Sequence, residues 1–148
     1  LKGKIAIVTG GTRGIGYSTV KTFLDNGATV ILFGSRQETV DKALNQLKES
    51  NSDYPVSGMA PNLQNAEEIA DAIHSIHEKY GRIDILVNNA GISQSAPLLD
   101  YKPGDFEMAM SINVTGFLLP TDSFVARYSS ISLSTIGDFL LLIRSTLA

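Results

Sequence analysis

Three glycines between an apolar run and a helical pattern constrain the fold of this chain more than any other feature. Residues 9–16 read TGGTRGIG and follow the apolar run Ile5–Val8. Their spacing, G-x-x-x-G-x-G, predicts a buried strand, a tight turn and a helix that begins near Tyr17. Glycines in such a turn let the backbone approach a phosphate, and a helix N-terminus favours the negative charge. The alternative is a glycine-rich connection that binds nothing.

The spacing also narrows the kind of phosphate. It differs from the G-x-G-x-x-G pattern of many dinucleotide-binding turns. No Lys-Ser or Lys-Thr pair follows the glycines, as a triphosphate loop would require. A dinucleotide pyrophosphate is therefore the better interpretation than a triphosphate with magnesium.

Composition excludes several other classes of function. The net charge is −3 and no stripe of lysine and arginine occurs, which argues against a nucleic-acid partner. The absence of cysteine excludes disulfides and thiolate metal sites. The longest apolar run, Phe139–Ile143, is too short to span a membrane. With no leader pattern before the first strand, we expect a cytoplasmic protein.

Apolar β-branched runs alternate with amphipathic stretches, which predicts an α/β fold with a doubly wound parallel sheet. The expected strands cover residues 5–8, 29–33, 54–59 and 83–87. Helices are expected up to Asn26-Gly27, over 37–50, from an Asn65 cap to Gly81, and from Pro103 onward, the last carrying Phe106, Met110, Val114 and Phe117. Pro120 is expected to kink or end that last helix. We therefore divide the chain into a dinucleotide-binding part, 1–119, and an atypical tail, 120–148.

The end of the second strand carries information on the cofactor. An acidic residue at this point binds a free ribose 2′-hydroxyl, whereas a cation suits a 2′-phosphate. Here Gly34 occupies the expected acidic position, and Arg36 follows it. Arg13 in the glycine loop is a second cation whose guanidinium fits a phosphate. The two arginines favour NADP(H) over NAD(H), whereas the nearby acidic Glu38 favours NAD(H). Ordinary surface arginines are the alternative.

Two further groups of polar side chains have more than one interpretation. Asn88 and Asn89 end the fourth strand, where their amides either line a ligand crevice or hold strand ends together, and both roles are compatible. His74 and His77 lie at i and i+3 of an expected helix. Without a third ligand they are typical of a surface helix face, so we expect no metal site.

Three motifs in order resemble the short-chain dehydrogenase/reductase family. They are Thr9-Gly10-x-x-x-Gly14-x-Gly16, Asn88-Asn89-Ala90-Gly91 and Asn113-Val114-Thr115-Gly116. The resemblance covers about residues 3–119 and is strongest to 3-oxoacyl-acyl-carrier-protein reductases and related dehydrogenases. It implies a Rossmann-like fold that is truncated after its first half, and homo-oligomers by analogy.

The resemblance also implies roles for individual residues. Those around the pyrophosphate and adenosine ribose would be Gly10, Thr12, Gly14, Ile15 and Gly16. The 2′-phosphate would bind Ser35, Arg36 and Arg13, and the approach to the nicotinamide would be lined by Asn89, Ala90 and Gly91. Asn62, next to Leu63, stands where the family commonly has an aspartate for the adenine amino group. Its carbonyl oxygen can still accept that hydrogen bond, so we expect weakened adenine binding. Asn113 matches the active-site asparagine.

By the same resemblance, the function would be NADP(H)-dependent hydride transfer with a carbonyl or alcohol substrate such as a 3-oxoacyl thioester, a ketone or a sugar-like compound. The family uses a serine, a tyrosine and a lysine four residues after the tyrosine. Here Ser132 stands four residues after Tyr128, and no lysine follows Lys102. The chain as written therefore lacks the pair. The alternative is an inactive NADP(H)-binding module or a fragment. Candidates for the substrate wall are Ser93, Gln94 and Ser95.

Overall fold

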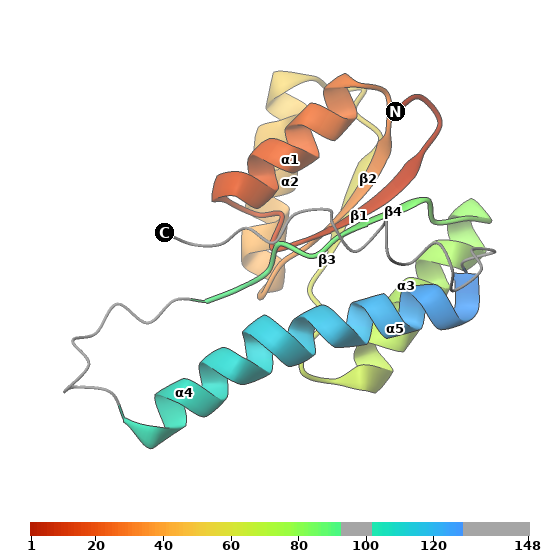
Figure 1. Cartoon of the computed structure of the whole chain (residues 1–148). Coiled ribbons are helices and arrows are strands. Elements are labelled where there is room, and N and C mark those ends of the chain that lie inside the picture. Colours follow the sequence, from red (N-terminus) through yellow and green to blue (C-terminus); the bar gives the residue numbers. More distant parts are fainter. Residues whose placement is uncertain (93–101, 129–148) are drawn as a thin grey trace.

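A four-stranded parallel sheet forms the centre of the molecule, with helices on both faces (Figure 1). The computed structural model describes residues 1–92 and 102–128. The strand order is β3-β2-β1-β4, so the chain winds outward through β2 and β3 and then crosses to the other side of β1. This is the predicted doubly wound α/β fold. The strands are β1 (Ile5–Thr9), β2 (Thr29–Phe33), β3 (Val56–Met59) and β4 (Ile85–Val87).

The helices alternate with the strands along the chain. They are α1 (Gly14–Asp25), α2 (Gln37–Ser50), α3 (Ala66–Tyr80), α4 (Pro103–Met110) and α5 (Gly116–Tyr128). A π-helical segment, η2 (Ser111–Thr115), joins α4 to α5, so the three form one long rod in Figure 1. No helix within residues 1–92 or 102–128 is long and apolar enough to cross a membrane.

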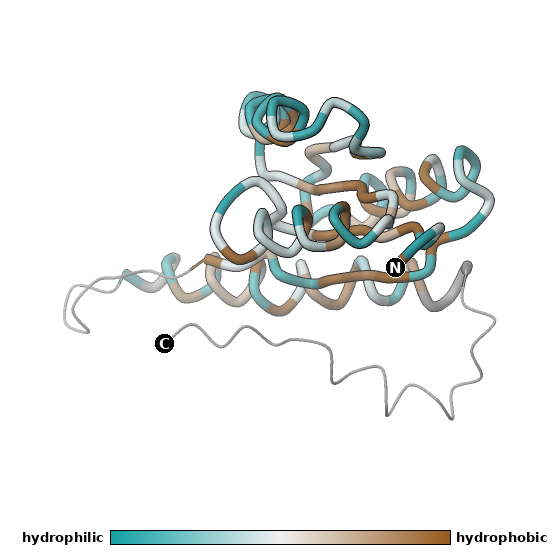
Figure 2. Tube along the Cα trace, turned by 90° about the horizontal axis from the view of Figure 1, so that it is seen from above, coloured by the Kyte–Doolittle hydropathy of each residue, from teal (hydrophilic) through white to brown (hydrophobic). Residues whose placement is uncertain are grey.

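Successive side chains of the central strands point to opposite faces of the sheet and divide the core in two. On β1, Ala6 and Val8 pack with α1 and α2, whereas Ile5 and Ile7 pack with α3 and Phe124 of α5. Both sets are buried, which explains why the strand reads as a continuous apolar run (Figure 2). A strand covered on both faces has no position for a polar side chain until its last residue.

The predicted start and end of α3 and the predicted end of α1 are confirmed. The Asn65 side chain caps α3 by accepting the backbone N–H groups of Glu67 and Glu68. Gly81 ends the same helix at φ +73°, and Gly27 follows α1 at φ +79°. These two positions need the left-handed conformation that glycine adopts without strain.

Three predicted boundaries were wrong by two or three residues. Helix α1 begins at Gly14 and not near Tyr17, so the last glycines of the loop belong to its first turn. Strand β3 begins at Val56 because Pro55 has no N–H and contributes only its carbonyl, to Val30 N at 3.0 Å. Strand β4 begins at Ile85 because the preceding Asp84 turns its side chain back to β1.

Pro120 was expected to kink or end its helix, and the expected end was wrong. Helix α5 continues through this residue to Tyr128. Pro120 lies in the second turn of α5, where its missing N–H removes one bond toward Gly116. Its ring is buried and α5 packs on α3 through Phe124, which keeps the helix intact. The helix runs across the boundary that we placed between 119 and 120, and the division into two parts stays a prediction. Residues 129–148 of the expected tail lie outside the described residues.

Three of the apolar side chains expected on the helix from Pro103 onward, two in α4 and one in η2, are largely exposed. Phe106 is 61% exposed, Met110 44% and Val114 40%. They do not join either core cluster, in contrast to Phe124 of α5. The apolar pattern of this helix therefore does not reflect burial against the described part of the chain.

Asp84 joins β4 to the start of β1 and gives a pH dependence to stability. Its carboxylate accepts the Ile5 N–H at 2.9 Å, the Lys4 ammonium at 3.3 Å, and the Arg82 guanidinium. Burial alone would raise the pKa of Asp84, but the hydrogen bonds from Arg82, Ile5 and Lys4 outweigh it and lower the pKa. A lowered pKa in the folded state adds stability at neutral pH, which is lost as the pH falls through that value.

We therefore expect Asp84→Asn to unfold at lower urea concentration than the wild type at neutral pH. The difference should narrow as the pH falls below the ordinary range of an aspartic acid. Urea unfolding at a series of pH values measures this. Asp71→Asn on the exposed face of α3 controls for the loss of one negative charge. A difference that stays constant with pH would contradict the assignment.

Candidate dinucleotide-binding site

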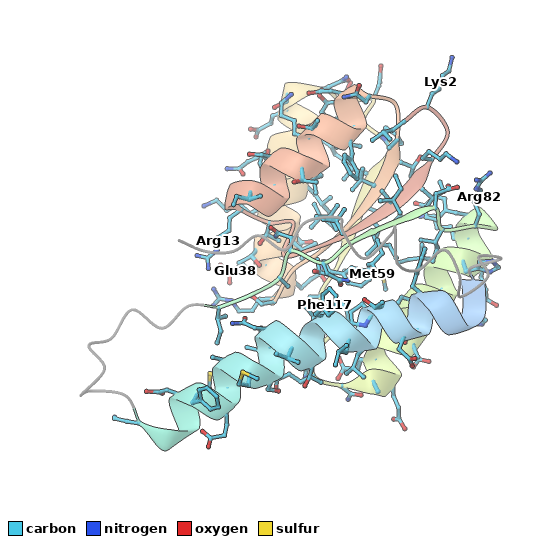
Figure 3. All side chains as sticks on the ribbon, viewed as in Figure 1. Lys2, Arg13, Glu38, Met59, Arg82 and Phe117 are labelled. Atoms are coloured by element: carbon cyan, nitrogen blue, oxygen red, sulfur yellow. The ribbon has the colours of Figure 1, made fainter. Side chains whose placement is uncertain are left out.

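The carboxyl ends of β1, β2 and β4 meet at one edge of the sheet. Thr9 is in register with Phe33, and Val8 with Val87. The strands are added on one side of β1 up to β3, and β4 is added on the other side, so the strand order reverses between β1 and β4. In open α/β sheets, ligands bind in the crevice at such a point. Figure 3 shows Arg13 and Glu38 near this edge, at the starts of α1 and α2, with Lys2 and Arg82 at the opposite end. Arg13, one of the predicted site residues, therefore lies at the edge where a dinucleotide would bind.

The Thr9 hydroxyl joins the glycine loop to the loop after β4. It is 1% exposed and accepts the N–H groups of Asn89 and Ala90, both at 3.0 Å. It also donates to the Val87 carbonyl at 3.4 Å. No individual role was predicted for Thr9 from the sequence. A threonine as the last residue of an otherwise apolar strand is the signal that could have indicated one.

Asn89 performs the structural role that was one of its two interpretations. Its Nδ2 donates to the carbonyls of Thr9 and Gly10, both at 3.1 Å. The neighbouring Asn88 donates to the Thr121 hydroxyl at 2.9 Å, which ties the end of β4 to α5. The Asn88 Oδ1 is buried and has no hydrogen-bond partner among the described residues. The ligand-lining role of Asn89, Ala90 and Gly91 stays a prediction.

Two of the three predicted glycines are needed for close packing. Gly10 has φ +66°, and an added Cβ would lie 2.9 Å from the Ala90 Cα. At Gly16 an added Cβ would overlap the Gly10 carbonyl oxygen and the Asn89 Nδ2. Gly14 has φ +55° but faces open space. Gly10 and Gly16 thus allow the glycine loop and the loop after β4 to pack closely, and Gly14 leaves the other side of the turn open.

The first turn of α1 is suited to an anion. Arg13 is the N-cap residue, and no side-chain hydrogen bond caps the helix. The N–H groups of the first turn therefore have no partner among the described side chains, and the helix dipole adds positive charge there. With the open space at Gly14, these features fit a pyrophosphate.

The end of β2 has no room for an acidic side chain. A Cβ at Gly34 would lie 2.6 Å from Val40 Cγ2 and 2.7 Å from Thr12 Cγ2. The Gly11 N–H also donates to the Phe33 carbonyl at 3.0 Å, so the glycine loop lies against this strand end. Ser35 and Arg36 are exposed just beyond it, and neither Arg36 nor Arg13 forms an ion pair with a described residue.

Asn62 and Leu63 follow β3 at the same edge. The Asn62 Oδ1 accepts the Gln64 N–H at 3.0 Å, and Leu63 packs partly into the α3 face of the core. Asn113 of η2 makes two bonds to the backbone of Ile92: Oδ1 accepts the N–H at 2.8 Å and Nδ2 donates to the carbonyl at 2.9 Å. The structure therefore places Asn113 against the loop after β4.

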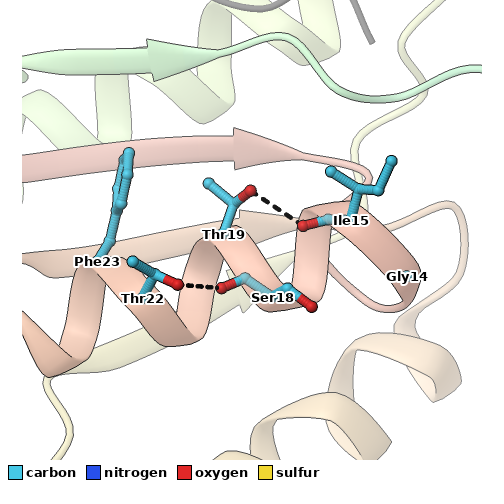
Figure 4. A pocket seen from close by; sticks show the side chains of 6 residues that line it. All are labelled: Gly14, Ile15, Ser18, Thr19, Thr22 and Phe23. Atoms are coloured by element: carbon cyan, nitrogen blue, oxygen red, sulfur yellow. Dashed lines mark hydrogen bonds between the residues drawn. The ribbon is translucent and has the colours of Figure 1, made fainter. Parts of the chain in front are cut away.

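Ile15 lies apart from the other predicted site residues. It is 60% exposed and, with Gly14, opens a shallow groove along α1 that continues over Ser18, Thr19, Thr22 and Phe23 (Figure 4). The hydroxyls of Thr19 and Thr22 donate to carbonyls of their own helix, both at 2.9 Å, so the groove offers mainly methyl groups. Only its Gly14 end meets the open side of the glycine loop.

Other predictions fall outside this geometry. Ser93, Gln94 and Ser95 lie outside the described residues. The described residues contain no group of three or more His, Cys, Asp and Glu side chains that could hold a metal ion. The His74 Nε2 lies 3.4 Å from the Glu78 Oε1, one turn further along α3.

The chain belongs to the short-chain dehydrogenase family, whose members are oxidoreductases that use a nicotinamide cofactor and small-molecule substrates. The family model described as short chain dehydrogenase matches residues 4–131. This confirms the resemblance seen in the three motifs, and the match runs about a dozen residues further than they did.

Two curated relatives illustrate the similarity. A 3alpha-hydroxysteroid dehydrogenase from Mediterraneibacter gnavus is 54% identical over 115 residues, which are 78% of this chain and 46% of the relative. The 3-oxoacyl-acyl-carrier-protein reductase FabG from Thermotoga maritima is 33% identical over 125 residues, 84% of this chain and 50% of the relative. The chain thus spans about half the length of these relatives.

Solved structures agree on the fold and differ in cofactor. A metagenomic short-chain oxidoreductase in complex with NADP has a TM-score of 0.73 at 27% identity, covering 85% of this chain and 58% of that one. An NAD+-bound xylitol dehydrogenase has a TM-score of 0.77 at 28% identity, covering 85% and 48%. The two together do not distinguish the cofactors.

Proposed function

We propose that this chain is the cofactor-binding half of an NADP(H)-dependent dehydrogenase that interconverts a carbonyl compound and an alcohol. One observation carries the choice of cofactor. The space at Gly34, where an acidic side chain would bind a free ribose hydroxyl, is filled by Thr12 and Val40, and two arginines without ion-pair partners among the described residues stand beside it.

The residues divide the binding of the cofactor among them. The N–H groups at the start of α1 would bind the pyrophosphate, and Gly10 and Gly16 keep the loops close enough to form its cradle. Arg13 and Arg36 would pair with the 2′-phosphate. When bound, the nicotinamide supplies or accepts a hydride. Asn113 would hold the loop after β4 in place through its two bonds to Ile92.

The proposal is tested by the affinities of the 148-residue chain for NADPH and NADH. We expect Arg36→Ala to weaken NADPH binding by about tenfold or more, as the loss of a charge-assisted contact predicts, and to leave NADH binding unchanged. Titration of the reduced nicotinamide fluorescence gives both dissociation constants. Lys2→Ala, at the opposite end of the molecule, is the control. An equal loss for both cofactors would contradict the assignment.

A second candidate is an NADP(H)-binding module without turnover. It is favoured by Ser132, which stands four residues after Tyr128, at the spacing where the family has a lysine. The two candidates differ in one measurement on the intact protein as its own cells make it, the consumption of NADPH with a 3-ketosteroid or a 3-oxoacyl thioester. These substrate classes follow the names of the two curated relatives. Binding without turnover would favour the module.

A further inference from the structure

The base end of the site can be placed from the sheet. The pyrophosphate belongs to the glycine loop after β1, and the ribose to the end of β2. The strand order β3-β2-β1 then carries the base toward the end of β3. The Gly34 N–H donates to the Met59 carbonyl at 3.0 Å, so these two strand ends are joined. Asn62, three residues after Met59, is the first polar side chain after the end of β3. It is therefore the candidate to contact the base.

The Asn62 amide has a defined orientation. Its Oδ1 accepts the Gln64 N–H at 3.0 Å, which fixes the oxygen toward its own turn. Among the described residues, none binds its Nδ2, and the side chain is exposed. The group that Asn62 offers to a ligand is therefore an N–H donor, together with the second lone pair of an oxygen already in use.

The turn that carries Asn62 is held in place by its neighbours. Glu68 accepts the Asn62 N–H at 2.9 Å with one carboxylate oxygen and the Asn65 Nδ2 at 3.1 Å with the other. The Asn65 N–H donates to the Asn62 carbonyl at 2.9 Å. Leu63 packs into the core and contacts the position of Gly116 on α5. Because the main chain is fixed, the orientation of the amide is a property of the fold.

We propose that the base end of this site accepts a 6-oxopurine about as well as a 6-aminopurine. A 6-amino group donates a hydrogen bond and a 6-oxo group accepts one. The Asn62 Oδ1 can accept from the first, and its Nδ2 can donate to the second. A carboxylate at this position would only accept, and would repel a 6-oxo group. Glu68 already places one carboxylate on the Asn62 N–H, so a second at position 62 would also face like-charge repulsion. The inference rests on the proposed function, since it concerns the same dinucleotide.

The test compares two reduced dinucleotide phosphates, NADPH and its hypoxanthine analogue, on the full 148-residue chain. The quantity measured is the ratio of their dissociation constants, from titration of the nicotinamide fluorescence. We expect the wild type to bind the two within about threefold, because the Asn62 amide can bond the 6-substituent of either base. Asn62→Asp should raise the ratio to about tenfold or more in favour of adenine. Asn62→Asp/Glu68→Gln makes the same change without the second carboxylate, in case the single variant folds poorly.

A matched control lies at the other end of β3. Asn51 makes the same kind of turn, with its Oδ1 accepting the Asp53 N–H at 3.0 Å. Asn51→Asp should leave the ratio unchanged. A wild-type preference of about tenfold for adenine, or an unchanged ratio in a folded Asn62→Asp/Glu68→Gln, would overturn the inference while leaving the proposed function intact. Failure of the wild type to bind NADPH would overturn both.

Discussion

Gly16→Ala is expected to destabilise the chain by about 3 kcal/mol and to abolish dinucleotide binding. The added Cβ would overlap the Gly10 carbonyl oxygen and the Asn89 Nδ2, and would lie 2.9 Å from the Gly10 carbonyl carbon. Two of these atoms belong to the backbone of a loop that is itself bonded to Asn89. The loop cannot move away without breaking both hydrogen bonds of the Asn89 amide.

The measurement is urea unfolding combined with NADPH titration. Gly104→Ala is the matched control, because Gly104 also lies in a helix but its added Cβ would meet nothing within 4 Å. That variant should be slightly more stable than the wild type, as alanine replaces glycine in a helix. Unfolding of Gly16→Ala at the wild-type urea concentration would show that the two loops are not in the contact described.

Gly34→Asp, the substitution that a cofactor switch toward NAD(H) would suggest, is expected to fail. It should lower stability by about 2 kcal/mol and produce no gain in NADH affinity. The Cβ alone would lie 2.6 Å from Val40 Cγ2 and 2.7 Å from Thr12 Cγ2, before any carboxylate is placed. The methyl groups of two residues therefore fill the space that the acidic side chain needs.

Removal of both obstacles should make the switch possible. Gly34→Asp combined with Thr12→Gly and Val40→Ala leaves room for the aspartate, and we expect this variant to bind NADH more tightly than NADPH. Thr12→Gly with Val40→Ala alone controls for the loss of packing, which costs stability because Val40 is fully buried. Tight NADH binding by Gly34→Asp alone would contradict the steric argument.

Much of the fold could be predicted because its periodicity is strong. The bounds of β2 and α2 agree with the predicted 29–33 and 37–50. Long-range contacts decided the rest. Pro120 stays within a helix because its side chain is buried and α5 packs on α3, and Asp84 leaves its strand to bind Ile5. Neither partner is near in sequence.

The candidate site could be predicted at the level of motifs and not of contacts. The glycines and Asn89 were identified from their spacing, and the structure brings them together. The role of the Thr9 hydroxyl was missed because its partners lie about 80 residues away in the sequence. The role of the Glu68 carboxylate was missed because its bond to the Asn62 N–H depends on a local turn. The Asn62 amide was expected to present its oxygen, and one lone pair of that oxygen already accepts the Gln64 N–H.

The shared hydroxyl of Thr9 has a consequence for how a ligand would be received. Because one buried oxygen accepts two N–H groups of the loop after β4 and the Asn89 amide returns two bonds to the glycine loop, the two loops form a single preorganised unit. A ligand that enters between them meets groups already in position. The conformational entropy of these loops is lost when the chain folds, so little of it remains to oppose binding.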